Sequence, residues 1–162
     1  MIVIYKFILC LVSLSLITIS CATKTLSGNE WIVLSGEHAK RITSQCSRPG
    51  PEHFDSTWEL TRSDIEILEE ELEKLQNILS KECCDPEARI SNVHKYHRQY
   101  IGIIVDGKRL IYINAFRPSF LTDEWRSEPI LICDGGPDYW GVLFDPLNKE
   151  FSNLSFNGGE PE

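Results

Sequence analysis

The clearest pattern of apolar and polar positions lies between residues 61 and 79. Apolar side chains recur there every three or four residues, at Ile65, Leu68, Leu72, Leu75 and Leu79. This spacing places them on one face of a helix, with glutamates on the opposite face. Thr61, followed three residues later by Asp64, is typical of a capped helix start. The pattern predicts one long amphipathic helix that packs its leucine face against another element.

After residue 97 the pattern changes to one that favours strands. Two runs rich in β-branched and aromatic residues, "YHRQYIGIIV" and "KRLIYINAF", flank an Asp-Gly pair at residues 106–107. This arrangement is a strong hairpin signal. A two-residue turn there pairs Val105 with Lys108 and, further along the strands, Gln99 with Asn114.

Three later runs also read as strands, "PILIC" at 129–133, "YWGVLF" at 139–144 and "FSNLSF" at 151–156. A short apolar run at 31–34 and a brief helix over 35–44 precede the long helix. The predicted fold is α+β, with one long amphipathic helix packed on a mostly antiparallel sheet of about five strands. A cystatin-like or PepSY-like shape would have this composition.

The N-terminus has the features of an export signal. Lys6 is followed by an uncharged run over residues 7–19, which is too short to span a membrane comfortably. We therefore expect a signal peptide over residues 1–20, a polar tether over 21–30 and a single α+β domain over 31–162. The sequence "ITISC" resembles the lipobox of bacterial lipoproteins, with Thr18 where the usual leucine stands, and this resemblance implies a lipid on Cys21. Ordinary cleavage, which would release a soluble secreted protein, is the alternative.

Charge limits the classes of partner. The chain has a formal net charge of −8, and twelve of its 24 acidic residues lie between Glu52 and Glu87. Nucleic acid and anionic membrane surfaces need a cationic footprint, so neither is an expected partner. We expect membrane contact through the lipid anchor only.

The cysteines of the expected mature domain are Cys46, Cys83, Cys84 and Cys133. In an exported protein this number indicates one or two disulfides. Adjacent cysteines rarely bridge each other, so we expect Cys46 to pair with Cys83 or Cys84. These two, with His94 and His97, lack the ligand spacing of zinc fingers, and no metal or other cofactor is expected.

The segment "CDGGPDYW" at residues 133–140 contains the residue types of an active site. Cys133 with a histidine base and Asp134 would suit nucleophilic catalysis, and Asp134 with Asp138 or Glu124 would suit a glycoside hydrolase. Aspartate beside glycine is also typical of turns. We expect a strand-to-strand corner, with positive φ at Gly135 or Gly136, and we assign no catalytic residue.

Several polar and aromatic residues are candidates for binding. They are Arg98, Gln99, Arg109, Asn114 and Arg117, with Trp125, Trp140 and Asp134. One interpretation is that the polar members satisfy buried backbone groups or pair with the acidic helix. The other is that they line a pocket for a peptide or small anion, with the tryptophans as anchors.

Four motifs, "YHRQYIGI", "GKRLIYINAF", "ICDGGPDYWGVLFD" and "FSNLSFNG", resemble a family of small exported bacterial proteins, often lipoproteins. The resemblance implies export and carries no catalytic residues. The sequence therefore predicts a non-enzymatic, periplasmic binding module, of inhibitor or immunity type among other roles. Its expected partner is a protein or a cell-envelope component. The alternative is an envelope hydrolase that uses carboxylates near Asp134.

Overall fold

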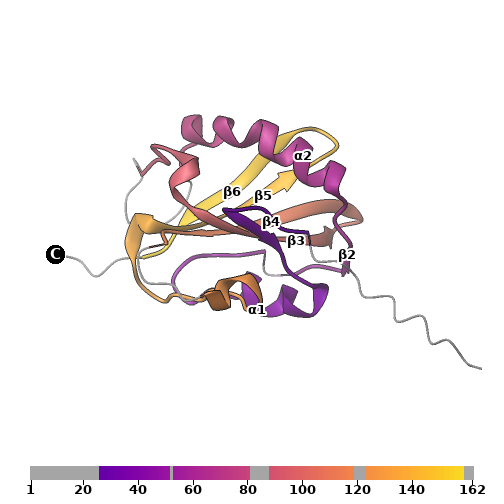
Figure 1. Cartoon of the computed structure of the whole chain (residues 1–162), viewed down its shortest axis with the longest axis horizontal. Helices are drawn as coiled ribbons and strands as arrows, with labels where there is room; N and C mark the ends of the chain where they lie inside the picture. Colours follow the sequence, from indigo (N-terminus) through magenta and orange to yellow (C-terminus); the bar gives the residue numbers. More distant parts are fainter. Residues whose placement is uncertain (1–25, 52, 81–87, 119–122, 159–162) are drawn as a thin grey trace, which may run out of the picture.

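The computed structural model describes residues 26–51, 53–80, 88–118 and 123–158, and these form a sheet with helical segments on both of its faces (Figure 1). The strands are β1 (Trp31–Val33), β2 (Ser56–Trp58), β3 (His97–Val105), β4 (Lys108–Phe116), β5 (Tyr139–Asp145) and β6 (Glu150–Phe156). Their order is β1-β3-β4-β5-β6, and β2 also pairs with β3. The α+β class and the mostly antiparallel sheet are thus confirmed.

The central hairpin follows the predicted register along its whole length. Val105 pairs with Lys108 and Gln99 pairs with Asn114, with the turn at residues 106–107. Asp106 and Gly107 both have positive φ, at 49° and 72°, as a tight two-residue hairpin turn requires. The turn chemistry therefore sets which side chains of β3 and β4 share a face.

The short strands β1 and β2 both pair with β3, on the side away from β4. β1 runs parallel to its first part and pairs Trp31 with Arg98. β2 runs antiparallel to its second part and pairs Trp58 with Gly102. The sequence did not predict β2, because Ser56 and Thr57 are polar and the strand is three residues long.

The strand predicted at residues 129–133 is wrong. β4 pairs directly with β5, from Ile111 with Phe144 to Phe116 with Tyr139, which leaves no place for a strand between them. The polar groups of this segment bond to side chains instead of to a neighbouring strand. The amide of Ile130 donates to Gln99 Oε1 at 3.0 Å, and its carbonyl accepts from Asn114 Nδ2 at 2.9 Å.

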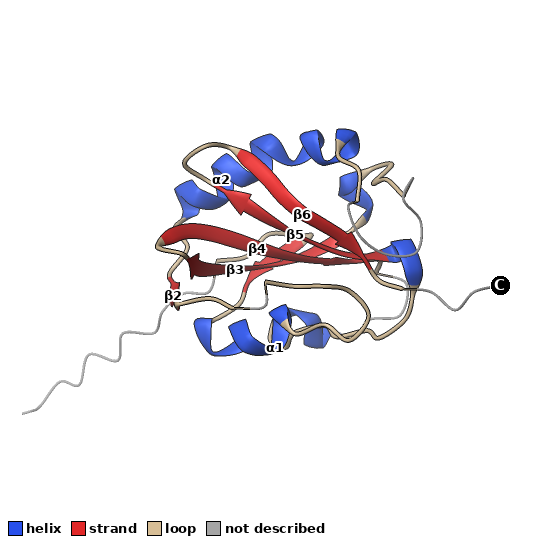
Figure 2. Cartoon of the chain, turned by 180° about the vertical axis from the view of Figure 1, so that it is seen from behind, coloured by secondary structure: helices blue, strands red, loops and turns tan. Residues whose placement is uncertain are grey.

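The prediction of one long helix is wrong, because the described residues form two short α-helices. They lie on opposite faces of the sheet (Figure 1). α2 (Arg62–Glu71) has the predicted capping box between Thr61 and Asp64 and continues as the 3₁₀ segment η2 (Leu72–Asn77). On the other face lie the 3₁₀ turn η1 (Gly36–His38) and α1 (Ala39–Thr43), close to the brief helix expected there. Both figures show α2 and α1 on opposite sides of the sheet (Figure 2). This arrangement differs from a sheet with a helix on one face only.

The leucine pattern holds until the helix ends. Leu68, Leu72 and Leu75 are fully buried against the sheet, and residues three apart stay on one side of a 3₁₀ helix. Ile78 then adopts an extended conformation, so the next predicted core residue, Leu79, is 47% exposed. We call residues 62–77 the helical cover.

The opposite face is covered by two segments that are far apart in the sequence. Residues 36–50 include η1 and α1, and residues 123–133 include the 3₁₀ turn η4 (Asp123–Arg126). Arg41 Nη1 and Glu128 Oε2 form an ion pair between them at 2.9 Å. Apolar side chains of both segments, among them Ile42 and Trp125, are buried there. We call this pair of segments the disulfide-linked cover, for the bond described next.

Candidate functional site

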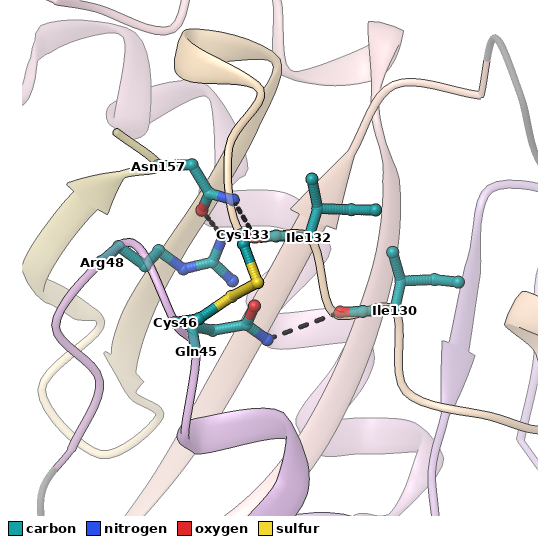
Figure 3. Close-up of a disulfide and its surroundings, with 7 residues drawn as sticks. All are labelled: Gln45, Cys46, Arg48, Ile130, Ile132, Cys133 and Asn157. Carbon is teal, nitrogen blue, oxygen red and sulfur yellow. Dashed lines mark hydrogen bonds between the residues drawn. A yellow bond between two sulfur atoms is a disulfide. The ribbon is translucent and has the colours of Figure 1, made fainter. Parts of the chain in front are cut away.

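Cys46 is bonded to Cys133, which joins the two segments of the disulfide-linked cover (Figure 3). The predicted pairing of Cys46 with Cys83 or Cys84 is therefore wrong, and residues 83 and 84 lie outside the described residues. Cys46 follows α1, and Cys133 lies in the segment that precedes β5. A sulfur in a disulfide is no thiolate, so the nucleophilic interpretation of Cys133 also fails.

The candidates Gln99 and Asn114 lie opposite each other on the paired strands β3 and β4, and both are buried. Asn114 Nδ2 donates to Gln99 Oε1 at 2.9 Å. Gln99 Nε2 in turn donates to the carbonyls of Trp125 at 2.7 Å and Glu128 at 2.6 Å. These amides satisfy the backbone of the disulfide-linked cover, as the first of the two interpretations expected.

Sequence reasoning missed two residues of the same buried network, Arg48 and Asn157. The Arg48 guanidinium is 5% exposed and donates to the side-chain carbonyls of Asn114 and Asn157. Asn157 Nδ2 donates to the carbonyl of Ile132 at 2.6 Å (Figure 3). The sequence offers little signal for this role, because Arg48 lies in a proline-rich stretch that resembles a surface loop. Its burial depends on contacts with residues more than sixty positions away.

Arg98 is buried on the other face, beneath the helical cover. It donates to the Tyr100 hydroxyl at 2.7 Å and forms an ion pair with Glu69 of α2 at 3.3 Å. The Tyr100 hydroxyl also donates to Glu69. Burial raises the pKa of Tyr100 well above its ordinary value, so this hydroxyl stays protonated. Arg98 thus pairs with the acidic helix, as the first interpretation allowed.

Three further binding candidates lie away from any shared site. Trp125 is 4% exposed and Trp140 is fully buried, so both belong to the core. Arg109 lies over the Trp58 ring, with 5.3 Å from its guanidinium carbon to the ring centroid. The predicted set therefore does not form one pocket.

The corner that contains Asp134 has the predicted positive φ values, but it joins an irregular segment to β5, so the prediction of a strand-to-strand corner is wrong. Gly135 and Gly136 have φ values of 125° and 56°, and a 3₁₀ turn over Gly136–Asp138 leads into β5. Asp134 itself is exposed, and it lines neither of the two pockets described below. The amide of Gly136 donates to the carbonyl of Gly158 at 3.2 Å, so this corner is tied to the chain beyond β6.

A surface pocket of about 580 Å³ opens where β3 begins and β4 ends. It is lined by Glu30, His94, Lys95, Tyr96, His97, Arg117, Pro118 and Asp138. Its volume is in the range of small-ligand sites. Arg117 is the one member that the sequence singled out for binding, and we call this the Arg117 pocket.

Arg117 is held in the pocket from several sides. Its Nε atom lies 2.8 Å from Asp138 Oδ1, and its backbone amide donates to the carbonyl of Asp138 at 3.1 Å. The guanidinium carbon lies 5.3 Å from the centre of the Tyr96 ring. Burial raises the pKa of Tyr96, although the charge of Arg117 opposes this effect. The charged group of Arg117 is therefore positioned before any ligand arrives.

His97 forms another wall of the pocket. Its ring stacks on Trp125 with 4.5 Å between centroids, and its Nδ1 atom is buried with no hydrogen-bond partner among the described residues. Burial lowers the pKa of His97 below its ordinary value, although Glu30 acts in the opposite direction. The imidazole is therefore neutral near pH 7.

A second pocket, of about 430 Å³, lies where β1 and β2 end. Leu26, Val33, Trp58 and Leu60 contribute apolar side chains to its lining. The Trp58 indole donates to the carbonyls of Ile103 and Leu110, so its polar end is already satisfied. This pocket lacks a charged side chain fixed like Arg117.

Comparison with known protein families, curated proteins and solved structures found no match to this chain. The resemblance to exported bacterial proteins therefore stays a prediction. Within the described ranges, no cluster of His, Cys, Asp and Glu side chains could hold a metal ion. No helix in that same part of the chain is long and apolar enough to span a membrane. The predicted signal peptide and Cys21 lie outside the described residues.

Proposed function

We propose that this protein is an exported, lipid-anchored binding module and that its ligand occupies the Arg117 pocket. The ligand is part of a protein or of a cell-envelope component. The observation that carries the proposal is the fixed guanidinium of Arg117, held by Asp138 and Tyr96 at the wall of a pocket of about 580 Å³. Such prior orientation lowers the entropic cost of binding a ligand.

The chemistry of the pocket favours binding over the hydrolase alternative. Both lining carboxylates face a guanidinium, with Asp138 at 2.8 Å from Arg117 and Glu30 at 3.6 Å from Arg98. Asp134 lies outside the pocket, and Cys133 is in a disulfide. A glycoside hydrolase needs two carboxyl groups free to act on opposite sides of the scissile bond. Ion-paired carboxylates are better suited to orienting neighbouring cations.

Pocket binding can be tested by filling the pocket. Pro118 is exposed at its rim, so Pro118→Trp should block entry and leave the core intact. Thermal unfolding would be followed with N-acetylated dipeptides, peptidoglycan fragments and small sugars as probes. We expect at least one probe to raise the melting temperature of the wild type, since a ligand that binds only the folded state stabilises it.

The matched control is Leu147→Trp, which adds the same side chain at a position 89% exposed in the turn between β5 and β6. The probe should still stabilise this variant but not Pro118→Trp. The proposal fails if no probe acts on the wild type, or if Pro118→Trp responds as Leu147→Trp does.

Export and anchoring rest on the sequence of residues 1–21. Cys21→Ser should move the protein from the membrane fraction to the soluble fraction, because stable anchoring needs the acyl chains that a lipoprotein receives. Cell fractionation with immunoblotting measures this. The control is Cys10→Ser, which removes a cysteine of the signal segment and should leave the protein in the membrane. A wild-type protein found wholly in the soluble fraction would contradict the anchor.

A further inference from the structure

We propose that the Arg117 pocket recognises a monoanionic carboxylate and that the Arg117 guanidinium is the group that binds it. This inference rests on the proposed binding function and names the chemistry of its ligand. It starts from the number of donors on this side chain. A guanidinium carries five N–H donors, and Asp138 does not use them up, because Nε lies 2.8 Å from Asp138 Oδ1 as an ion pair without a hydrogen bond.

The remaining donors are available on the pocket side. The Arg117 side chain is 37% exposed although its Nε end is paired. The terminal nitrogens of a guanidinium form a planar fork that matches the two oxygens of a carboxylate. A guanidinium fixed at its Nε end presents this fork in one orientation.

Among the described residues, the pocket contains one cation that is not neutralised by a neighbouring carboxylate. Each lining carboxylate already faces a guanidinium, Asp138 that of Arg117 and Glu30 that of Arg98. Lys95 lines the same pocket, and its ammonium has no ion-pair partner in the described part of the chain. With His97 neutral, Arg117 and Lys95 balance Glu30 and Asp138 among the lining side chains, and the Lys95 ammonium is free to face an anion.

The same balance separates a carboxylate from a phosphate. Two carboxylates stand at the pocket wall, and they would repel a second negative charge on the ligand at close range. A single negative charge on the ligand can be matched by the Lys95 ammonium, which has no ion-pair partner within the described ranges. The Tyr96 ring and Pro118 offer apolar surface for the carbon atoms next to such a carboxylate.

The test uses three small probes and the folded, ¹⁵N-labelled protein. N-acetylglycine carries one carboxylate, N-acetylglycinamide is its neutral isostere, and inorganic phosphate is the alternative anion. NMR titration would follow the side-chain Nε–H signals of Arg117 and Arg109. Arg109 is the internal reference, because it also lies 5.3 Å above an aromatic ring but outside the pocket.

We expect N-acetylglycine to shift the Arg117 signal in a saturable way and to leave the Arg109 signal unchanged. The neutral isostere and phosphate should bind at least about tenfold more weakly. Arg117→Gln lacks the Arg117 signal and is followed through the backbone amides of residues 94–97. It should weaken N-acetylglycine binding by about tenfold or more, the loss expected for one charge-assisted bidentate contact. Arg109→Gln should have no effect, and Lys95→Gln should weaken binding by a few fold.

Three results would overturn the inference. They are equal binding of the acid and its amide, tighter binding of phosphate, and equal affinity in Arg117→Gln and Arg109→Gln. The inference would also fail if N-acetylglycine at millimolar concentration, in about 50-fold excess over the protein, caused no shift of the Arg117 signal. The two proposals can fail separately. If a neutral probe binds the wild type but not Pro118→Trp, the pocket is a binding site and the carboxylate specificity is wrong. The ¹⁵N spectrum of each variant shows whether it is folded.

Discussion

The helical cover and the disulfide-linked cover bury opposite faces of one sheet, yet different chemistry holds each in place. The helical cover presents a row of leucines that are fully buried, with one buried arginine ion-paired to Glu69. The disulfide-linked cover has no comparable row of regularly spaced leucines among its described residues. Its backbone is bonded instead to the side chains of Gln99, Asn114 and Asn157, and its two segments share the Cys46–Cys133 bond.

The difference shows two ways to attach a segment to a sheet. An amphipathic helix satisfies its own backbone, so apolar contacts alone can hold it. A segment without regular structure has free N–H and C=O groups that must find partners when buried. Here β3 and β4 supply those partners as side-chain amides. The stability of the irregular cover should therefore depend on a few specific polar contacts.

The largest effect is expected from removing the disulfide in a Cys46→Ser, Cys133→Ser double variant. The bond closes a loop with a sequence separation of 87 residues, and its loss should cost up to roughly 4–5 kcal/mol of unfolding free energy. Hydrogen exchange measured by mass spectrometry should speed up in residues 39–50 and 123–133. Residues 62–77 should speed up less, and equal loosening of both covers would contradict the contrast.

The next largest effect is expected in the helical cover, from Leu72→Ala. This side chain is fully buried, and its truncation should cost about 3 kcal/mol through lost burial and the cavity left behind. Leu79→Ala is the matched control, because Leu79 is 47% exposed and should cost well under that amount. Urea unfolding measures both. Equal losses would mean that the helix continues past Asn77.

A smaller loss is expected from Asn114→Ala, which removes the central amide of the polar network. The carbonyl of Ile130, the Gln99 amide and the Arg48 guanidinium would each lose a partner, at a cost of about 2 kcal/mol. Asn29→Ala, at an exposed position, should be close to neutral. If urea unfolding finds the two variants equally stable, the network is not what holds this cover.

The smallest effects are expected at the corner that links the disulfide-linked cover to β5. Gly136→Ala should cost about 1 kcal/mol, because the residue has a left-handed backbone with open space around it. Gly135→Ala should cost more, since an added Cβ would lie 2.6 Å from the Tyr139 ring. Thermal unfolding ranks the two. The reverse order would show that strain rather than contact sets the cost.

Local patterns in the sequence predicted the parts of the fold that depend on neighbouring residues. The Asp-Gly pair at 106–107 specified the hairpin and placed Gln99 opposite Asn114. The leucine spacing located α2, and Thr61 and Asp64 located its start. These features are short-range, because turn geometry and helical period act within a few residues.

The parts that could not be predicted depend on contacts between distant residues. Apolar composition made residues 129–133 resemble a strand, but side chains of Gln99 and Asn114 capture their backbone. The predicted disulfide partner of Cys46 was wrong for the same reason, since the spacing of cysteines alone does not fix disulfide connectivity. The Arg117 pocket combines Glu30, residues 94–97 and Asp138, which no local pattern links. Only Arg117 was predicted as a binding residue, whereas His94, His97 and Asp138 were considered for other chemistry.

The Cys46–Cys133 bond also divides the chain into a covalent ring and two tails. The ring contains α2 and the strands β2, β3 and β4, whereas β1 lies on the first tail and β5 and β6 lie on the second. The sheet is thus assembled by placing a strand of each tail beside strands of a closed ring. A protease that cuts once between residues 47 and 132 would leave both fragments covalently joined. The nicked protein would stay one molecule, with every strand still attached, until a reductant opened the ring.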